Sequence, residues 1–427
     1  MRVGAPRGME DCFNVNSLAT RHAPDVALPL AHFLTGVAAA LLGGLALLAW
    51  APRLLAQPVG AFPTLAVTHL FTLGWLAMTI VGATYQMVPV VLEVQLRSER
   101  LARAGYPVLL AGAALMVAGF WTARVALLIA GGACAVAALV VYAGHIIATA
   151  LGAHPRARVA QRFILAATAY LVLVGVLGGL LIAAFRWNLV HADLLPVHAV
   201  TALLGWATIL AMGAAYRLTP MFALSHGHGD GAAALVLPLV AVGTLVVLLG
   251  LLLGWPRAVM AVAGLPPCAA IAVFVRDQWA FLRTRRRPHL DTGLRLTMAA
   301  TLYLAATAAV AWLGLAGLWR PGHGAVVILG LLGWLGCLVA GQTYKIVPFL
   351  VWYRRYAARA GREKVPLLRE MYDERLAALG MWGLAAAGLV LAAGAAAGTP
   401  WLQRLGAVCW LVGYGVLAWN LGQVLRA

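Results

Sequence analysis

Charged residues are scarce in this sequence. They make up 10% of its 427 residues, whereas ordinary soluble domains carry about 25%, so an ordinary soluble domain is excluded. Hydrophobic residues make up 63%, which excludes a disordered chain, because disorder requires low hydrophobicity. With a mean hydropathy of +0.91, the composition indicates an integral membrane protein.

Several functional motifs are missing as well. The five cysteines form neither a CxxC nor a CxxCH motif, so neither a zinc knuckle nor a covalently attached c-type haem is expected. Asp and Glu are absent from the middle of every apolar segment, and Glu93 and Asp193 lie only at segment ends. Buried acids are typical of proton pumps and carboxylate-coupled transporters, so both classes are disfavoured.

Long apolar segments dominate the chain. A helix that crosses the hydrocarbon core needs about 20 apolar residues, and twelve segments meet this requirement. We therefore predict an all-α polytopic membrane protein with one transmembrane domain over 27–427 and a cytoplasmic tail over 1–26, which lacks a signal-peptide pattern. The predicted spans are 27–50, 63–92, 104–122, 125–150, 162–185, 194–222, 232–254, 258–281, 295–317, 324–352, 376–396 and 402–425.

Positive charge predicts the orientation. With the N-terminus inside, the cytoplasmic segments and helix ends hold 25 of the 31 Lys and Arg residues, as the positive-inside rule requires. We expect both termini in the cytoplasm of a bacterium, the protein in its inner membrane, and the lipid bilayer as the partner of the basic loops, with no nucleic-acid binding.

One arginine lies in each outer turn, and each has a Trp within three residues. Two interpretations stay open. These arginines belong to an aromatic belt of snorkelling side chains, or some of them, such as Arg53, Arg186 and Arg320, pair with anionic groups of a bound cofactor. The six are Arg53, Arg124, Arg186, Arg257, Arg320 and Arg404.

The second, sixth and tenth spans carry the same motif. It reads Gly-Trp-x6-Gly-x2-Tyr-x3-Pro and begins at Gly74, Gly205 and Gly333, so the copies start 131 and 128 residues apart. We predict three four-helix repeats, 27–150, 162–281 and 295–425, with pseudo-threefold symmetry. The glycines favour close packing, because small residues promote helix association in lipid.

Histidines are the remaining candidates for intramembrane chemistry. His69 and His198 lie in the outer halves of two motif spans, while His191 lies in an outer turn and His323 opens the tenth span between two glycines. Neutral imidazole binds haem iron and also suits copper. All four are candidate metal ligands, although a single helical His is often structural.

Other histidines favour a structural role. His32 and His145 lie near the inner ends of their spans, where bonding to the backbone is the simpler interpretation. The segment from His226 to Asp230 could grip a metal, but a solvated loop is the preferred interpretation.

In these histidines and motif spans, the sequence resembles the haem–copper oxidase subunit I superfamily. Pro196-Val197-His198 followed by Gly205-Trp206 looks like the helix II haem motif of that superfamily, in which a His stands seven residues before Gly-Trp. His198-Ala199-Val200-Thr201 and the run 209–212 are also similar to the NnrS family of haem- and copper-containing membrane proteins. The resemblance implies a twelve-helix scaffold that holds haem b, with His69 and His198 as leading ligands, and copper as a further cofactor.

The sequence departs from the oxidases at two helices. They carry a His pair on helix VII and two His on helix X, whereas the seventh span here has no His and the tenth has only His323. A binuclear oxygen-reducing centre is therefore not expected.

Three functions stay open. The first is a haem-binding protein of electron transfer, nitric oxide handling or respiratory metabolism, with a periplasmic cytochrome c or another redox protein as partner. The second is a copper or haem delivery protein, and the third is an assembly subunit without cofactor. Haem-dependent oxidoreductase activity, the reaction and the oligomeric state are not determined by the sequence.

Overall fold

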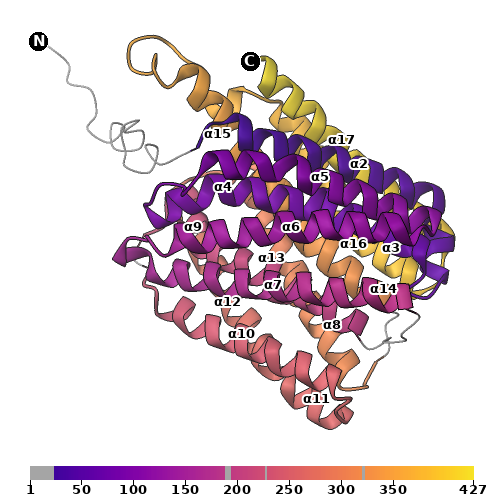
Figure 1. Ribbon diagram of the computed structural model, residues 1–427. Coiled ribbons are helices and arrows are strands. Elements are labelled where there is room, and N and C mark those ends of the chain that lie inside the picture. The colour runs from indigo at the N-terminus through magenta and orange to yellow at the C-terminus, as the bar shows by residue number, and fades with distance from the viewer. Residues whose placement is uncertain (1–23, 188–193, 227, 320–322) are drawn as a thin grey trace, which may run out of the picture.

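The computed structural model describes residues 24–187, 194–226, 228–319 and 323–427, and these fold into helices that run side by side along the long axis of the molecule (Figure 1). Twelve of the helical stretches are long and apolar enough to cross a membrane. The prediction of an all-α chain with twelve helices able to span a membrane is thereby confirmed for the described residues. The predicted tail lies almost wholly outside the described residues.

The helices follow one another with short connections. Their bounds are α2 (Ala27–Ala56), α3 (Phe62–His69), η2 (Leu70–Ala77), α4 (Met78–Leu92), α5 (Glu99–Thr122), α6 (Val125–Ala150), η3 (Pro155–Ala157), α7 (Arg158–Trp187), α8 (Leu194–Val200), η4 (Thr201–Thr208), α9 (Ile209–Ala223), α10 (Gly231–Leu252), α11 (Arg257–Ala263), α12 (Leu265–Arg283), α13 (Thr292–Leu315), α14 (His323–Ile328), η5 (Leu329–Leu335), α15 (Gly336–Tyr356), η6 (Leu368–Glu370), α16 (Glu374–Ala396) and α17 (Pro400–Arg426).

Several helices begin earlier than hydropathy predicts, because polar side chains cap them beyond the apolar core. The third span begins at Glu99 instead of residue 104, and the Ser98 hydroxyl accepts a hydrogen bond from the Leu101 amide at 3.3 Å. Asp291 caps α13 and Asp373 caps α16 in the same way. Such caps satisfy amides that have no partner within the helix.

Each of the three motif spans contains a π-helical segment at its Gly-Trp pair. These segments are η2, η4 and η5, and each is framed by ordinary α-helix on both sides. Hydropathy did not predict this feature. Short π-helical insertions are rare and frequently occur at functional sites, so the three motif spans are the leading candidates for a functional site.

The second motif glycine has the same kind of neighbour in each copy. A Cβ placed on it would come within 3.0 Å or less of a Cβ atom on the first helix of its own predicted repeat, so only glycine allows this approach. The pairs are Gly82 with His32, Gly213 with Phe163 and Gly341 with Leu296. These local contacts recur three times, while the pseudo-threefold arrangement of the whole bundle stays a prediction.

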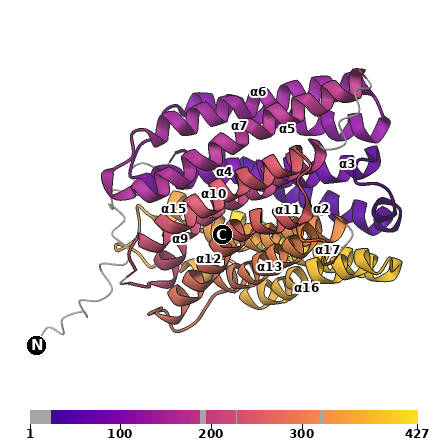
Figure 2. The ribbon, with the colours of Figure 1, turned by 90° about the horizontal axis from the view of Figure 1, so that it is seen from below.

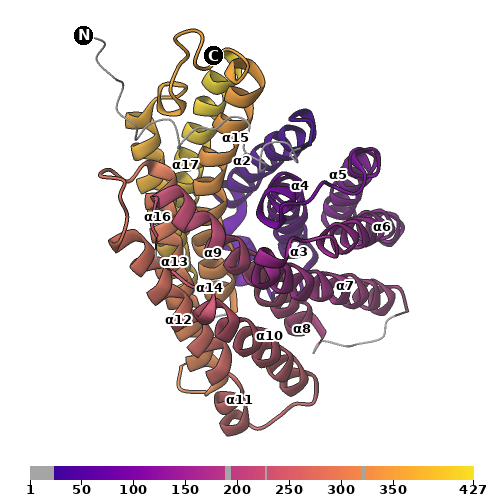
Figure 3. The same ribbon diagram turned by 90° about the vertical axis from the view of Figure 1, so that its left-hand side faces the viewer.

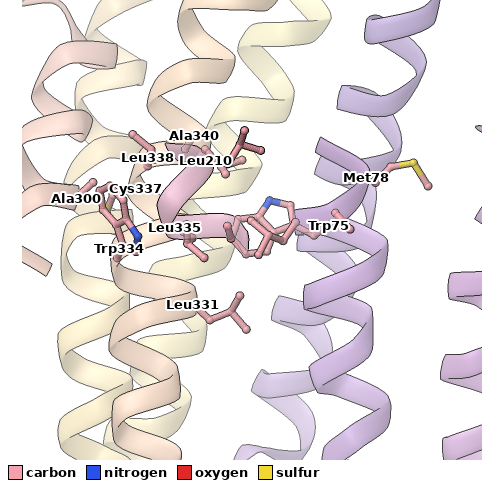
Figure 4. Packing of buried hydrophobic residues seen from close by; sticks show 14 of the residues in the cluster. Trp75, Met78, Leu210, Ala300, Leu331, Trp334, Leu335, Cys337, Leu338 and Ala340 are labelled. Atoms are coloured by element: carbon pink, nitrogen blue, oxygen red, sulfur yellow. The ribbon is translucent and has the colours of Figure 1, made fainter. Parts of the chain in front are cut away.

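The second and tenth spans form the interior of the bundle. In their most apolar stretches 67% and 83% of the residues are buried, against 22–44% in the other ten spans, which leave more surface toward lipid. Viewed along the helices, α3 and α14 lie inside the ring formed by their neighbours (Figure 3). At the centre, Trp75, Leu210 and Leu335 bring the three motif spans into one apolar cluster (Figure 4).

The first and last spans close the bundle. Helix α17 packs along α2 (Figure 2), and the indole Nε1 of Trp410 donates a hydrogen bond to the Ala40 carbonyl at 2.9 Å. Trp410 also contacts the rings of Trp75 and Tyr414. The N-terminal and C-terminal ends of the described chain are therefore held in a single body.

Candidate functional site

A cavity of about 280 Å³ lies among the motif spans. Its walls come from α2, α3, η2, α5, α6, α7, α8, η4, α14, η5 and α16, and almost all of its lining side chains are apolar. None of the lining residues is charged. The six lining residues with amide, hydroxyl or imidazole groups are Gln57, Thr64, Thr68, His69, Thr72 and His198. Its volume lies near the lower end of the range for small-molecule and cofactor sites, about 300–1,000 Å³.

His69 is one of the two histidines that line this cavity. It is the last residue of α3, and its Nδ1 lies 2.8 Å from the Leu65 carbonyl. A carbonyl can only accept, so Nδ1 carries the proton and Nε2 keeps its lone pair. The ring also lies 4.9 Å from that of Phe120, at 30°. A histidine whose Nδ1–H donates to a backbone carbonyl has the orientation and basicity that metal-bound histidines usually show.

His198 lines the same cavity from α8. A Cβ placed on Gly178 would lie 3.4 Å from the Cε1 atom of its ring, so α7 passes close beside the imidazole. The Val174 carbonyl is near the ring, but the buried Nδ1 makes no hydrogen bond of standard geometry. The two imidazoles are close enough to interact electrostatically. The structure thus brings together the two leading ligand candidates, with His69 bonded to the Leu65 carbonyl and His198 close to the Val174 carbonyl.

The other predicted site residues are placed differently. Arg53 and Arg186 are exposed in the last turns of α2 and α7 and do not line the cavity. Their neighbours in the chain do, since Leu54 and Phe185 belong to its walls, so both arginines stand next to it. His191, Arg320 and the side chain of His323 lie outside the described residues.

No cluster of metal-binding side chains forms among the residues the structure describes. Groups of three or more His, Cys, Asp or Glu with suitable geometry are absent from them. A copper site built from several protein ligands therefore finds no support there. Haem iron makes a smaller demand, because the porphyrin supplies four ligands and the protein one or two.

His32, His145 and His228 make structural contacts. Nδ1 of His32 donates to the Leu28 carbonyl at 2.8 Å, and Nε2 of His145 accepts from the Ser98 amide at 2.9 Å. The predicted bond to a backbone carbonyl is confirmed for His32 and is the same bond that His69 makes to Leu65, whereas His145 accepts from an amide instead. His228 hydrogen-bonds to Ser225 and Thr284 in the loop after α9, which agrees with a structural loop.

Two features of the interior escaped the sequence analysis. Thr68 and Thr72 line the cavity on either side of His69, and their spacing relative to that histidine was a usable signal. Lys345 lies inside the tenth span with its side chain only 13% exposed, and its ammonium group pairs with Asp291. A lysine within an apolar segment is by itself a sequence signal of a buried polar site. Its partner, Asp291, comes after the basic segment 283–287 and just before the ninth span.

The sequence was also compared with known proteins. No family model matches the chain, and no curated protein is significantly similar to it.

Proposed function

We propose that this protein is a multi-pass membrane protein that binds a b-type haem in the cavity between its motif spans and acts in electron transfer, nitric oxide handling or respiratory metabolism. One observation carries the proposal. Imidazoles from the second and sixth spans meet in a single apolar cavity inside the membrane, and His69 offers an Nε2 lone pair that no described residue engages.

The residues that line the cavity suit a haem group. His69 would hold the iron, since its Nδ1–H bond to Leu65 fixes the ring and raises its basicity, and His198 is the second candidate ligand. Walls of Leu, Val and Phe would exclude water from the cofactor. When bound, haem iron supplies one-electron chemistry and binding of small ligands, while the chain tunes both by ligation and burial.

The arginines beside the cavity fit the acidic edge of such a cofactor. Arg53 and Arg186 adjoin cavity-lining residues and are exposed, so their guanidinium groups are free to pair with propionates. With both termini in the cytoplasm, this end of the bundle faces the periplasm of a bacterial inner membrane. A periplasmic cytochrome c or another redox protein would then be the partner.

Absorption spectroscopy tests the proposal. The full-length protein is expressed with ample haem, purified in mild detergent, and measured oxidised and dithionite-reduced. We expect a Soret band with reduced α and β bands, loss of bound haem in His69→Ala, and altered bands in His198→Ala. The matched control is His228→Ala, which removes a loop histidine outside the cavity.

Two outcomes would contradict the proposal. Haem-free protein under these conditions excludes the function, and bound copper in the same sample would favour the delivery protein instead. Unchanged haem content in both the His69 and His198 variants would show that the cavity is not the haem site.

A further inference from the structure

We infer that an anionic phospholipid binds between α12 and α13, with an acyl chain in an apolar groove and its phosphate group at Arg257. None of the residues that line this groove belongs to the cavity around His69 and His198. The inference is therefore independent of the proposed function, and it assigns a ligand to a surface that haem binding does not use.

The groove lies on the outside of the bundle. It has a volume of about 290 Å³, and α12 and its neighbour α11 stand at the edge of the bundle (Figure 3). The lining residues of α12 fall within its first eight residues, 265–272, and those of α13 fall within 305–312, near the end of that helix. Ala272 and Ala309 are exposed, so the groove is open toward the surrounding lipid.

The polar groups inside the groove are already used. The thiol of Cys268 donates to the Ala308 carbonyl at 3.8 Å, and Nε1 of Trp312 donates to the Ala261 carbonyl at 2.9 Å. The other lining residues have aliphatic side chains only. A polar ligand would lose its hydrogen bonds to water here, whereas an acyl chain needs none.

Arg257 is held at one end of the groove. It begins α11, and the bond between Trp312 and Ala261 fastens α11 to the last turns of α13. A Cβ placed on Gly317, two residues after α13, would lie 2.6 Å from Cδ and 3.2 Å from Nη1 of Arg257. Gly317 has a φ of +72° and no side chain, so the guanidinium group can lie against the turn that follows α13.

The charge of this guanidinium group is not compensated by the protein. Arg257 is exposed and forms neither an ion pair nor a hydrogen bond with any part of the chain that the structure describes. Trp319, in the turn after α13, is 49% exposed, as is typical of tryptophans at the level of the lipid headgroups. A lipid phosphate is the anion available at that level, and basic sites between membrane helices bind anionic headgroups.

The length of the groove suits one lipid chain. Ala305 stands twelve residues before Gly317, which corresponds to about 18 Å of helix. One leaflet contributes half of the hydrocarbon core, about 15 Å. A chain whose phosphate lies at Arg257 would therefore run along the groove to the middle of the bilayer. A free phosphate ion could reach Arg257 but would leave the groove unfilled.

Photo-crosslinking in vesicles tests the inference. The full-length protein is reconstituted into phosphatidylcholine vesicles that contain a small share of a lipid with a diazirine on its acyl chain. This probe carries either a phosphatidylglycerol or a phosphatidylcholine headgroup, and labelled peptides are identified by mass spectrometry. We expect the groove segments 265–272 and 305–312 to be labelled about fivefold more by the phosphatidylglycerol probe, the preference that one arginine near an anionic lipid gives.

Three variants locate the two parts of the site. Arg257→Gln should remove the preference for phosphatidylglycerol while the groove is still labelled at the level of phosphatidylcholine. Arg404→Gln is the matched control, because Arg404 is also an exposed arginine beside a tryptophan in an outer turn, and it should keep the preference. Ala309→Phe fills the groove and should lower its labelling by both probes, while unchanged labelling of the other helices shows that the variant has folded.

Three outcomes would overturn the inference. The first is equal labelling of the groove by the two probes, and the second is a preference that survives Arg257→Gln. The third is a groove that takes no label in protein that migrates as a dimer, which would assign it to an interface between two copies of the chain. Inorganic phosphate added as a competitor should not remove the preference, and its removal would assign Arg257 to a free anion instead. Haem content is measured separately, so failure here leaves the proposed function standing.

Discussion

Trp334 and Thr208 join two of the π-helical segments. The indole Nε1 of Trp334 in η5 donates to the Thr208 hydroxyl in η4 at 3.0 Å, and that hydroxyl in turn donates to the Leu203 carbonyl. The sixth and tenth spans are thus connected by a polar bond in the apolar core, and the cavity-lining residues Leu331 and Leu332 precede Trp334 in the same π-helical segment.

Trp334→Phe should therefore weaken the protein modestly. One buried interhelical hydrogen bond is lost, which costs about 0.6–1.7 kcal/mol in membrane proteins, and the smaller phenyl ring adds a packing loss. A double-mutant cycle with Thr208→Val, measured by reversible unfolding in detergent and lipid, should return the hydrogen-bond part as coupling energy. Trp382→Phe, at a 69% exposed position, is the control. Zero coupling would mean that the bond does not contribute.

Breaking the ion pair between Lys345 and Asp291 should lower the free energy of unfolding by more. Asp291→Asn keeps the helix cap on the Leu294 amide but leaves the buried ammonium group without its partner, which should destabilise the protein by about 3 kcal/mol. Adding Lys345→Met removes the orphaned charge and should restore most of that loss. If the two substitutions instead destabilise additively in unfolding experiments, the ion pair does not stabilise the protein.

The sequence specified some of these features and not others, for physical reasons. Span number follows from the length of apolar runs, and the depth of His69 and His198 follows from helix geometry, so both could be predicted. The π-helical segments, the placement of Thr68 and Thr72 in the cavity wall, and the position of Arg53 beside the cavity instead of in its wall depend on contacts between spans. Spacing along one helix carries no information about such contacts.

The orientation of the chain can be tested with reporter fusions. The excess of Lys and Arg in alternate connections predicts that Ala427 lies in the cytoplasm. A green fluorescent protein fused after Ala427 should fluoresce when expressed in a bacterium, and an alkaline phosphatase fused at the same position should be inactive. The reverse pattern would place the cavity mouth on the cytoplasmic side and exclude a periplasmic redox partner.

Gly205 and Gly178 differ in their surroundings, because Gly205 is tightly packed against a ring and Gly178 lines the cavity. A Cβ on Gly205 would lie 2.5 Å from Cδ1 of Tyr170, whose hydroxyl is fixed by a bond to the Ala241 carbonyl. The ring cannot withdraw freely, so Gly205→Ala should destabilise the protein by about 1–3 kcal/mol through overpacking. A Cβ on Gly178 would instead meet the His198 ring at an ordinary contact distance of 3.4 Å.

Gly178→Ala should therefore leave the unfolding temperature close to that of the wild type. Its added methyl group narrows the cavity beside His198, so the bands of bound haem should shift while haem is retained. Measuring both quantities on both variants distinguishes a packing glycine from a site glycine. If Gly178→Ala lowers stability as much as Gly205→Ala does, then α7 packs tightly against α8 and the space beside His198 is not available to a cofactor.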